Sequence, residues 1–400
     1  NLKELRDTEG RSSCNFFRSL GLDYLYVGEG NDIPSLVAAF AKVKDTSRPT
    51  VVHIHTQKGK GYAPAEADRE EFHWEMPFDL ETGKPKVDCS GMEDYHSLTG
   101  KFSLEKMKED HTVVAISSGT PTVIGFTPER RKQAGRQFVD VGIAEEHAVA
   151  LASGIAAGGG RPVYGVYSTF IQRCYDQLSQ DLCINGNPAV ITVFMGTVAG
   201  MNDVTHLGFF DIPLISNIPN MVYLAPTCSE EYFAMLEWAV RQTEYPVAIR
   251  VPGVAVVHRK EEFDTDYSEL NRYKMTARGE TVAILALGSF YDLGQALKNK
   301  LREESGVEAT LINPRYITGL DEPMLEELKV GHRIVVTLED GVLDGGFGEK
   351  IARYYGNSEM RVLNYGLRKE FADRYNLDEL MKTNRLTDKQ MAEDIAGILE

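Results

Sequence analysis

The sequence predicts an α/β protein in which helices cover parallel sheets on both faces. Ten short runs rich in β-branched residues recur along the chain, and most are nearly continuous in apolar residues. Helix-like segments lie between most of these runs. Strands that are apolar throughout are buried on both faces, and strands that alternate with helices pair in parallel. The number of runs indicates more than one sheet.

The sequence predicts strands and helices that alternate along most of the chain. Clusters of β-branched residues predict strands at residues 50–56, 112–117, 136–143, 161–167, 189–196, 221–226, 246–252, 281–288, 309–314 and 333–340. Segments of helical character between them predict helices over residues 34–44, 229–242 and 291–305. Residues 139–154, VDVGIAEEHAVALASG, predict a strand that turns directly into a helix.

Two changes in composition divide the chain into three parts. Residues 62–100 are polar, contain proline and glycine and show little periodicity, which indicates a linker or an extended excursion. Residues 258–275 are charged and irregular. The predicted parts are therefore residues 1–85, 95–258 and 275–400.

The composition is typical of a soluble, reduced protein. Hydrophobic residues make up 42% and charged residues 26% of the chain, and the formal net charge is −16. This acidity argues against an extended surface that binds nucleic acid or anionic membranes. It does not exclude a local basic pocket for an anionic substrate. The five cysteines are widely spaced, and no long apolar run occurs. We therefore expect a cytoplasmic protein with no transmembrane helix.

Two adjacent carboxylates and a histidine stand at the predicted strand-to-helix junction: Glu145, Glu146 and His147. Acidic side chains in the first turn of a helix interact favourably with the helix dipole by about 0.3–1 kcal/mol, so their position alone demands no function. They have to be interpreted together with the loops that follow the other strands.

The loop after the first predicted strand, TQKGKGYAPAE (56–66), combines glycines with lysines. Gly59 and Gly61 allow the backbone to approach a ligand closely. Lys58 and Lys60 can offer cations to a phosphate. A flexible basic turn explains the same residues without a ligand.

Three histidines lie in the same region. His73, in EFHWEMPFD, suits either a functional site or a packed aromatic edge. His53 and His55 alternate on one face of a predicted strand, and such an H-x-H pair can bind a metal ion. The sequence places no carboxylate or thiol beside this pair, so we assign no metal ligand to it.

The segment after the predicted strand 161–167 reads VYSTFIQRCYDQL (166–178). Tyr167 and Phe170 suit stacking on a flat heterocycle, and Arg173 suits an anion. An amphipathic helix with a surface arginine is the alternative.

A glycine-rich loop, GTVAGMNDVTHLGFFD (196–211), follows the next predicted strand and carries Asn202, Asp203 and His206. A lone histidine on such a loop is a common arrangement in active sites. Because parallel sheets bind ligands beyond the C-terminal ends of their strands, these loops are expected to form one site.

These motifs resemble one enzyme family over nearly the whole chain. Residues 139–182 are similar to the pyrimidine-binding domain of the 1-deoxy-D-xylulose-5-phosphate synthase family, which belongs to the transketolase family of thiamine diphosphate enzymes. GLDYLYVGEGNDIPSL, HIHTQKGKGYAPAE and FH…PFD match upstream, and THLGFFD and MVYLAPTCSEE match downstream. The resemblance implies three-layer α/β domains of the transketolase fold. Residues 1–85 would end an N-terminal diphosphate-binding domain, 95–258 would bind the pyrimidine, and 275–400 would be the C-terminal α/β domain.

The resemblance implies a catalytic role for Glu145, which would hydrogen-bond the aminopyrimidine ring of thiamine diphosphate and favour its imino tautomer. Phe170 would stack on that ring, and Tyr167 would line the same pocket toward the substrate. His206 and His73 would lie near the reacting carbon, for proton shuttling and carboxylate binding.

The resemblance also implies roles for three basic residues. Lys58 would reach the cofactor, and Arg173 and Arg250 would bind the phosphate of the acceptor. Glu146 stands where the family usually has glutamine and receives no catalytic role, and His147 is expected to be structural.

Several features depart from the family pattern. The Gly-Asp-Gly motif that binds Mg²⁺ and diphosphate is absent, and the first residues, NLKELRDTEG, lack an initiating methionine. We therefore expect the Mg²⁺ ligands in a domain that precedes residue 1, in a longer protein or a separate chain. Asn202, Gly253 and Asn31 stand where the family usually has Asp, a second phosphate-binding Arg and His. A lost arginine–phosphate contact weakens acceptor binding. The sequence therefore indicates the identity of the acceptor less firmly than it indicates the family.

The implied reaction decarboxylates pyruvate and joins its two-carbon unit to glyceraldehyde 3-phosphate, giving 1-deoxy-D-xylulose 5-phosphate. Two alternatives stay open: a transketolase-like or 2-oxo acid dehydrogenase β-like subunit with another acceptor, and a non-catalytic subunit that dimerises and pairs with a separate cofactor-binding chain. Family members are homodimers, so a homodimer is expected, with the C-terminal domain supporting dimerisation. Glu339 and the GGFG turn (345–348) are expected to be structural.

Overall fold

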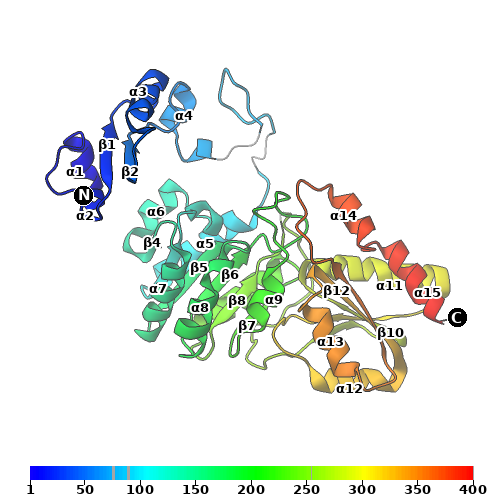
Figure 1. Cartoon of the computed structure of the whole chain (residues 1–400). Coiled ribbons are helices and arrows are strands. Elements are labelled where there is room, and N and C mark those ends of the chain that lie inside the picture. The colour runs from blue at the N-terminus through cyan, green and yellow to red at the C-terminus, as the bar shows by residue number, and fades with distance from the viewer. Residues whose placement is uncertain (74–76, 88–90, 254, 400) are drawn as a thin grey trace. The chain divides into compact units, whose positions relative to one another are not determined.

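The computed structural model describes residues 1–73, 77–87, 91–253 and 255–399. Within these ranges the chain forms two compact units, Asn1–Met92 and Glu93–Glu400 (Figure 1).

The first unit contains a small parallel sheet. Strand β1 (Asp23–Val27) pairs with β2 (Thr50–Ile54), and helix α3 (Ile33–Val43) connects them. Asp32 caps α3, because its carboxylate accepts a hydrogen bond from the backbone N–H of Ser35. The other helical elements of this unit are α1 (Leu2–Asp7), α2 (Phe16–Ser19), α4 (Ala63–Ala67) and the 3₁₀ turn η1 (Glu71–His73).

In the described part of the second unit, six strands form an all-parallel sheet in the order β4-β3-β5-β6-β8-β7. Their bounds are β3 (Val113–Ser117), β4 (Phe138–Asp140), β5 (Arg161–Tyr167), β6 (Val190–Phe194), β7 (Val222–Leu224) and β8 (Val247–Arg250). The helices of this domain are α5 (Tyr95–Glu109), α6 (Pro128–Ala134), α7 (Glu145–Ala157), α8 (Tyr175–Gln177), α9 (Asp211–Ser216) and α10 (Ser229–Arg241).

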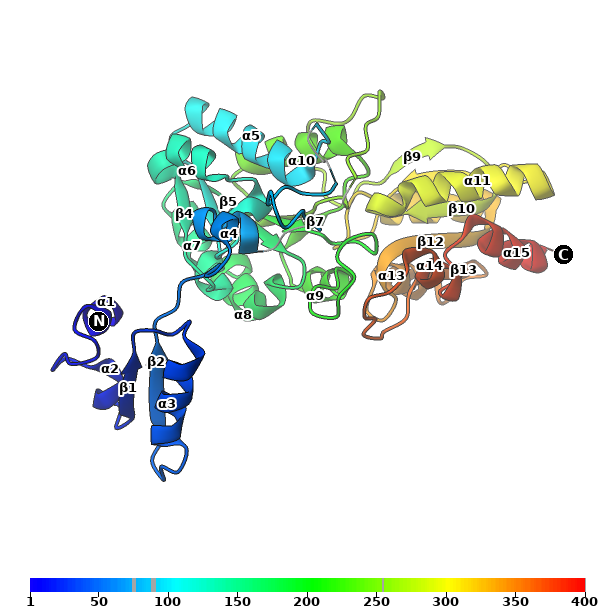
Figure 2. The same ribbon diagram turned by 90° about the horizontal axis from the view of Figure 1, so that it is seen from above.

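Helices cover this sheet on both faces. Val163 of β5 belongs to one buried cluster, whereas its neighbour Tyr164 belongs to the other. Val190 and Ile191 of β6 alternate in the same way. Helices α5 and α10 pack against one cluster and α7 against the other, which gives three layers (Figure 2). This arrangement explains why the strands are apolar at successive positions.

A second sheet follows in the order β13-β12-β10-β11-β9 among the described residues. Its strands are β9 (Lys274–Ala277), β10 (Thr281–Ala286), β11 (Thr310–Asn313), β12 (His332–Val342) and β13 (Arg361–Leu367). All pairs are parallel except β9 with β11, which is antiparallel. The helices of this domain are α11 (Tyr291–Ser305), α12 (Glu322–Gly331), α13 (Phe347–Tyr355), α14 (Leu377–Thr383) and α15 (Asp388–Leu399).

The predicted α/β class is confirmed, and each of the ten predicted strands contains or overlaps a strand. The three predicted helices correspond to α3, α10 and α11, and the predicted strand-to-helix junction corresponds to β4 and α7. Strands β1, β9 and β13 were not predicted. The segment 62–100, expected to be a linker, contains α4 and the start of α5.

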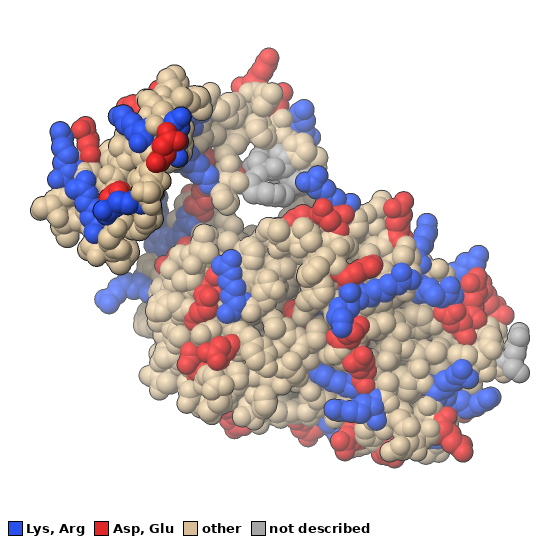
Figure 3. Space-filling model, in the orientation of Figure 1, with Lys and Arg blue, Asp and Glu red and all other residues tan. Residues whose placement is uncertain are grey.

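The surface is mixed in charge. On the face shown in Figure 3, lysines and arginines are interspersed with acidic side chains. In the part of the chain that the structure describes, no helix has the length and hydrophobicity that crossing a bilayer requires.

Glu339 connects the second sheet to α13. Its carboxylate is fully buried and accepts hydrogen bonds from the backbone N–H groups of Phe347 (2.8 Å) and Gly348 (2.7 Å). A Cβ on Gly346 would lie 2.5 Å from Oε2 of Glu339, so this turn requires a glycine for close approach. Burial raises the pKa of Glu339 to about 7. These contacts support the structural role expected for Glu339 and the GGFG turn.

We expect the free energy of unfolding to decrease as the pH rises from about 4.5 to 7, because Glu339 becomes ionised over this range. A carboxyl group whose pKa is raised in the folded state contributes its full stabilisation below the ordinary pKa of 4.5. That contribution is lost as the pH rises through the folded-state pKa of about 7. At about 1.4 kcal/mol per pKa unit, the loss is on the order of 3 kcal/mol. Urea unfolding at several pH values measures it. Glu339→Gln should remove this component, and an identical pH dependence in both proteins would contradict the assignment.

Candidate active site

Loops from neighbouring parallel strands meet at one edge of the six-stranded sheet. Glu145 begins α7, just beyond the end of β4, and Tyr167 is the last residue of β5. Phe170 directly precedes, and Arg173 lies within, the 3₁₀ turn η4 (Ile171–Cys174) that follows β5. His206 lies on the loop after β6. The C-terminal ends of parallel strands share one edge, where such sheets bind ligands.

Glu145 is a buried carboxylate at a helix start. It is 2% exposed, whereas Glu146 and His147 beside it are exposed. Its Oε2 accepts a hydrogen bond from Nη1 of Arg173 at 3.2 Å, and the Arg173 side chain is 55% exposed. A buried carboxylate needs compensation, which the helix N-terminus and this arginine provide. Burial therefore distinguishes Glu145 from its neighbours, which their shared position at a helix start does not.

Aromatic rings form a wall that arises from the same edge of the sheet. The rings of Tyr167 and Phe170 meet edge-to-face with centroids 5.4 Å apart. The His206 ring lies 5.4 Å from Phe170 and 6.5 Å from Tyr167. All three side chains are partly exposed, and the backbone N–H of Arg173 bonds to the carbonyl of Phe170 at 3.3 Å. Such a wall can stack on a flat ring.

Asp203 orients His206. The Oδ1 atom of Asp203 lies 3.0 Å from Nδ1 of His206, and the backbone N–H of His206 donates to the carbonyl of Asp203 at 3.0 Å. Hydrogen bonds from Thr205 and then from His206 lower the pKa of Asp203, so this carboxylate stays ionised. Nδ1 then carries the proton that Asp203 accepts, which leaves Nε2 as the atom that can exchange a proton. The acid beside His206 is therefore Asp203, one position after Asn202, which stands where the resembled family usually has Asp.

His96 is a residue of this site that the sequence did not reveal. Its ring stacks on Phe194 with centroids 4.7 Å apart and meets Tyr167 edge-to-face at 6.3 Å. Nδ1 lies 2.6 Å from the carbonyl oxygen of Val123, so Nδ1 donates to it. Burial lowers the pKa of His96, which keeps the ring neutral near pH 7. His96 comes from α5, not from a loop after a strand, and no motif marks it.

The structure surrounds Arg250, for which a substrate-binding role is predicted, with buried protein partners. Arg250 is 3% exposed, and its Nε donates to Oδ2 of Asp211 at 2.7 Å. Its Nη1 donates to Asp340 of the second sheet, and Nη2 donates to the carbonyl of Gly208 at 3.2 Å. Two buried carboxylates occupy the guanidinium, so it has no free face for a phosphate. Arg250 instead joins the two sheets.

Lys58 and His73 belong to the first unit, where they contact each other. Nζ of Lys58 lies 2.6 Å from Nδ1 of His73. Asn31 contacts the residue that precedes Lys58. Its Oδ1 accepts a hydrogen bond from the backbone N–H of Gln57 at 2.6 Å. The sequence predicted one site from all of these residues; the structure places Lys58 and His73 in the first unit and Glu145, Phe170 and His206 in the second.

Among the described residues, no group of three or more His, Cys, Asp and Glu side chains is arranged to hold a metal ion. Within the first unit, Nδ1 of His53 lies 2.5 Å from the hydroxyl of Tyr24. This contact gives His53 a structural partner.

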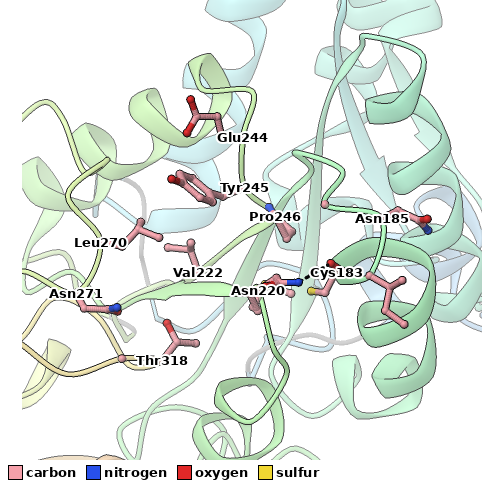
Figure 4. Close-up of a pocket in the computed structure, with 14 residues that line it drawn as sticks. Cys183, Asn185, Asn220, Val222, Glu244, Tyr245, Pro246, Leu270, Asn271 and Thr318 are labelled. Atoms are coloured by element: carbon pink, nitrogen blue, oxygen red, sulfur yellow. Dashed lines mark hydrogen bonds between the residues drawn. The ribbon is translucent and has the colours of Figure 1, made fainter.

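A cavity of about 460 Å³ lies at the opposite edge of the six-stranded sheet. Asn220, Tyr245 and Asn271 are among its lining residues (Figure 4). It borders the starts of β7 and β8, away from the strand ends that carry Glu145 and His206. We therefore do not include it in the candidate site.

Two family patterns match the chain, and known proteins resemble it over most of its length. The transketolase pyrimidine-binding domain matches residues 94–256, and the transketolase C-terminal domain matches residues 272–391. A 1-deoxy-D-xylulose-5-phosphate synthase from Clostridium acetobutylicum is 34% identical over 394 residues, covering 96% of this chain and 60% of the relative. The synthase from Lachnoclostridium phytofermentans is 36% identical over 336 residues, covering 84% and 53%. The chain thus spans about 60% of the length of the first relative.

Solved transketolase structures share the fold. A split-gene transketolase, described as an inactive β4 tetramer, aligns with a TM-score of 0.63 at 20% identity, covering 77% of this chain and 98% of that one. A transketolase from Pichia stipitis in complex with sedoheptulose 7-phosphate aligns with a TM-score of 0.60 at 14% identity, covering 95% and 67%. The two domain patterns, which together match most of the chain, show that it belongs to the transketolase family and carries the family's pyrimidine-binding domain and C-terminal domain.

Proposed function

We propose that the chain is part of a thiamine diphosphate-dependent transferase that moves a two-carbon unit from pyruvate, with loss of carbon dioxide, to glyceraldehyde 3-phosphate. The product would be 1-deoxy-D-xylulose 5-phosphate, as the name of the relatives implies. The observation that carries the proposal is the buried carboxylate of Glu145 at the sheet edge that also holds the aromatic wall.

The residues at this edge fit the pyrimidine end of thiamine diphosphate. A buried carboxylate can share a proton with a ring nitrogen, and the rings of Phe170 and Tyr167 offer a stacking surface beside it. When bound, the cofactor would supply an electron sink for the decarboxylation. Mg²⁺ would accompany its diphosphate, and we assign that ion no ligand among the described residues.

The residues of the chain would divide the remaining tasks. Glu145 would hold the proton on the ring nitrogen, which requires Arg173 to move off Oε2. Arg173, then unpaired and half exposed, would bind the anionic part of a substrate. His206, oriented by Asp203, would move a proton at Nε2. The roles predicted for His73 and Lys58 stay predictions; within the first unit these two side chains contact each other.

A second candidate is the same transfer to a different acceptor. Arg250 is occupied by Asp211 and Asp340, and Gly253 offers no side chain, so neither supplies a cation for the acceptor phosphate. This observation favours an acceptor other than glyceraldehyde 3-phosphate. For either candidate we propose a homodimer, as in the family resemblance.

The test uses the native protein purified from its own cells together with every chain that copurifies. It is supplied with thiamine diphosphate, Mg²⁺, pyruvate and glyceraldehyde 3-phosphate. We expect carbon dioxide and 1-deoxy-D-xylulose 5-phosphate in equal amounts. Carbon dioxide release that needs a different aldehyde would select the second candidate. No decarboxylation with any acceptor would overturn both.

A further inference from the structure

We propose that residues 373–375 of the C-terminal domain form a clamp that positions the loop carrying His206, with Tyr375 as its main positioning residue. The inference rests on the proposed function only for the catalytic use of His206. The clamp consists of contacts between this segment and the loop 198–206, both of which lie within the second unit.

The clamp holds the loop through hydrogen bonds on both sides of Asp203. The backbone N–H of Arg374 donates to the carbonyl of Asn202 at 2.6 Å, and Nδ2 of Asn202 donates to the carbonyl of Tyr375 at 3.1 Å. The backbone N–H of Val204 donates to Oδ1 of Asp373 at 3.1 Å. Both neighbours of Asp203 are therefore fixed.

Tyr375 fastens the earlier part of the same loop. Its hydroxyl donates to the carbonyl of Val198 at 2.7 Å and lies 3.4 Å from that of Met201. Its ring lies 6.3 Å from Phe209, centroid to centroid, and burial raises the pKa of the hydroxyl to about 12. The hydroxyl thus stays protonated and serves as a donor throughout the physiological pH range.

The position of the loop affects the orientation of His206 through Asp203. Asp203 contacts His206 twice, at Nδ1 and at the backbone N–H, each at 3.0 Å. The hydrogen bonds of the clamp described above go to the residues around Asp203 and His206 and not to these two residues themselves. The clamp acts through the backbone on either side of Asp203, and a carboxylate moved by even about 1 Å would lose its alignment with the imidazole.

The loop has little apolar packing of its own at this point. Asn202, Val204 and Thr205 are exposed. A cavity of about 260 Å³ lies between the start of the loop and α14, and is lined by Val198, Ala199, Leu377 and Met381 among others. Val198 itself is buried in an apolar cluster with Leu207, so packing holds the start of the loop and the hydrogen bonds of the clamp act on the exposed part that follows.

Hydrogen exchange measured by mass spectrometry on this chain, without substrate, tests the clamp. We expect Tyr375→Phe to raise amide exchange in peptides covering residues 196–210 by about five- to ten-fold, since one hydrogen bond of ordinary net strength is lost. Tyr354→Phe is the matched control, because it removes a hydroxyl that bonds Glu322 and Glu326 elsewhere in the same domain. Unchanged exchange in the loop of Tyr375→Phe would overturn the proposal.

The exposed Asp373 supplies a second test that does not disturb a half-buried ring. Asp373→Ala removes the acceptor for Val204, whereas Asp373→Asn keeps an oxygen at that position. We expect Asp373→Ala to loosen the loop and Asp373→Asn to restore wild-type exchange. Equal exchange in these two variants would contradict the clamp.

Turnover separates the clamp from the proposed function. In the native enzyme, Tyr375→Phe should lower kcat about five- to ten-fold while the KM for pyruvate stays unchanged, because His206 is misaligned but not lost. A wild-type protein without transferase activity whose loop still loosens in Tyr375→Phe would overturn the proposed function and support the clamp. A rigid loop in Tyr375→Phe would overturn the clamp whatever the activity.

Discussion

Glu145→Gln is expected to lower kcat for two-carbon transfer by about 10²–10⁴-fold, the range that one positioned proton-transfer group contributes. Glutamine keeps the shape of the side chain but cannot share a proton with a ring nitrogen as a carboxylate does. The effect depends on burial: Glu145 is 2% exposed, so water does not replace the lost group. Single-turnover measurements on the native enzyme would report the loss directly.

Glu146→Gln is the matched control for this substitution. Glu146 is the next residue of the same helix turn, but it is exposed. A role limited to the helix dipole would give both variants the same small effect, about 0.3–1 kcal/mol in stability and none in kcat. Titration calorimetry with thiamine diphosphate and Mg²⁺ adds a second readout, because only Glu145→Gln should weaken cofactor binding. Equal kcat in the two variants would refute the assignment of Glu145.

Strands buried on both faces could be predicted from the sequence, whereas the three strands that were missed, β1, β9 and β13, all lie at sheet edges, although the edge strands β2, β4 and β7 were predicted. Every residue of β6, VITVF, is buried, and only Thr192 interrupts its apolar run. Strands β9 and β13 form the two edges of the second sheet, and their sequences, KMTA and RVLNYGL, mix polar with apolar residues because part of each strand faces solvent. β1 likewise lies at a sheet edge, because β2 pairs with only one of its two edges, and four of its five residues are only partly buried.

The site could be predicted where it depends on loops that follow strands. Phe170 and His206 were identified in this way, and the structure brings them together. His96 lies on a helix that reaches the site only through packing on Phe194, and no spacing in the chain encodes that contact. The position of Asp203 likewise depends on the local path of the loop, which a one-residue offset in sequence obscured.

Arg250→Met is expected to destabilise the second unit by about 3–5 kcal/mol. The substitution leaves Asp211 and Asp340 buried without their shared cation, and an uncompensated buried charge costs this much. Tyr223, which donates to Asp211, and Ser289, which donates to Asp340, cannot replace a positive charge. Urea unfolding of the chain measures the change. Arg278→Met is the control, because Arg278 pairs with Glu327 at the surface and should cost at most about 1 kcal/mol.

The same variant decides between the structural role of Arg250 and the substrate-binding role expected from the sequence. If the cost comes from unpaired carboxylates, Asp211→Asn and Asp340→Asn introduced together into Arg250→Met should recover part of the lost stability, because no buried charge then remains. If Arg250 faces the acceptor, Arg250→Met should cost no more stability than Arg278→Met. In that case the KM for the phosphorylated acceptor should rise while the unfolding midpoint stays unchanged, because the guanidinium would have been held available for the phosphate.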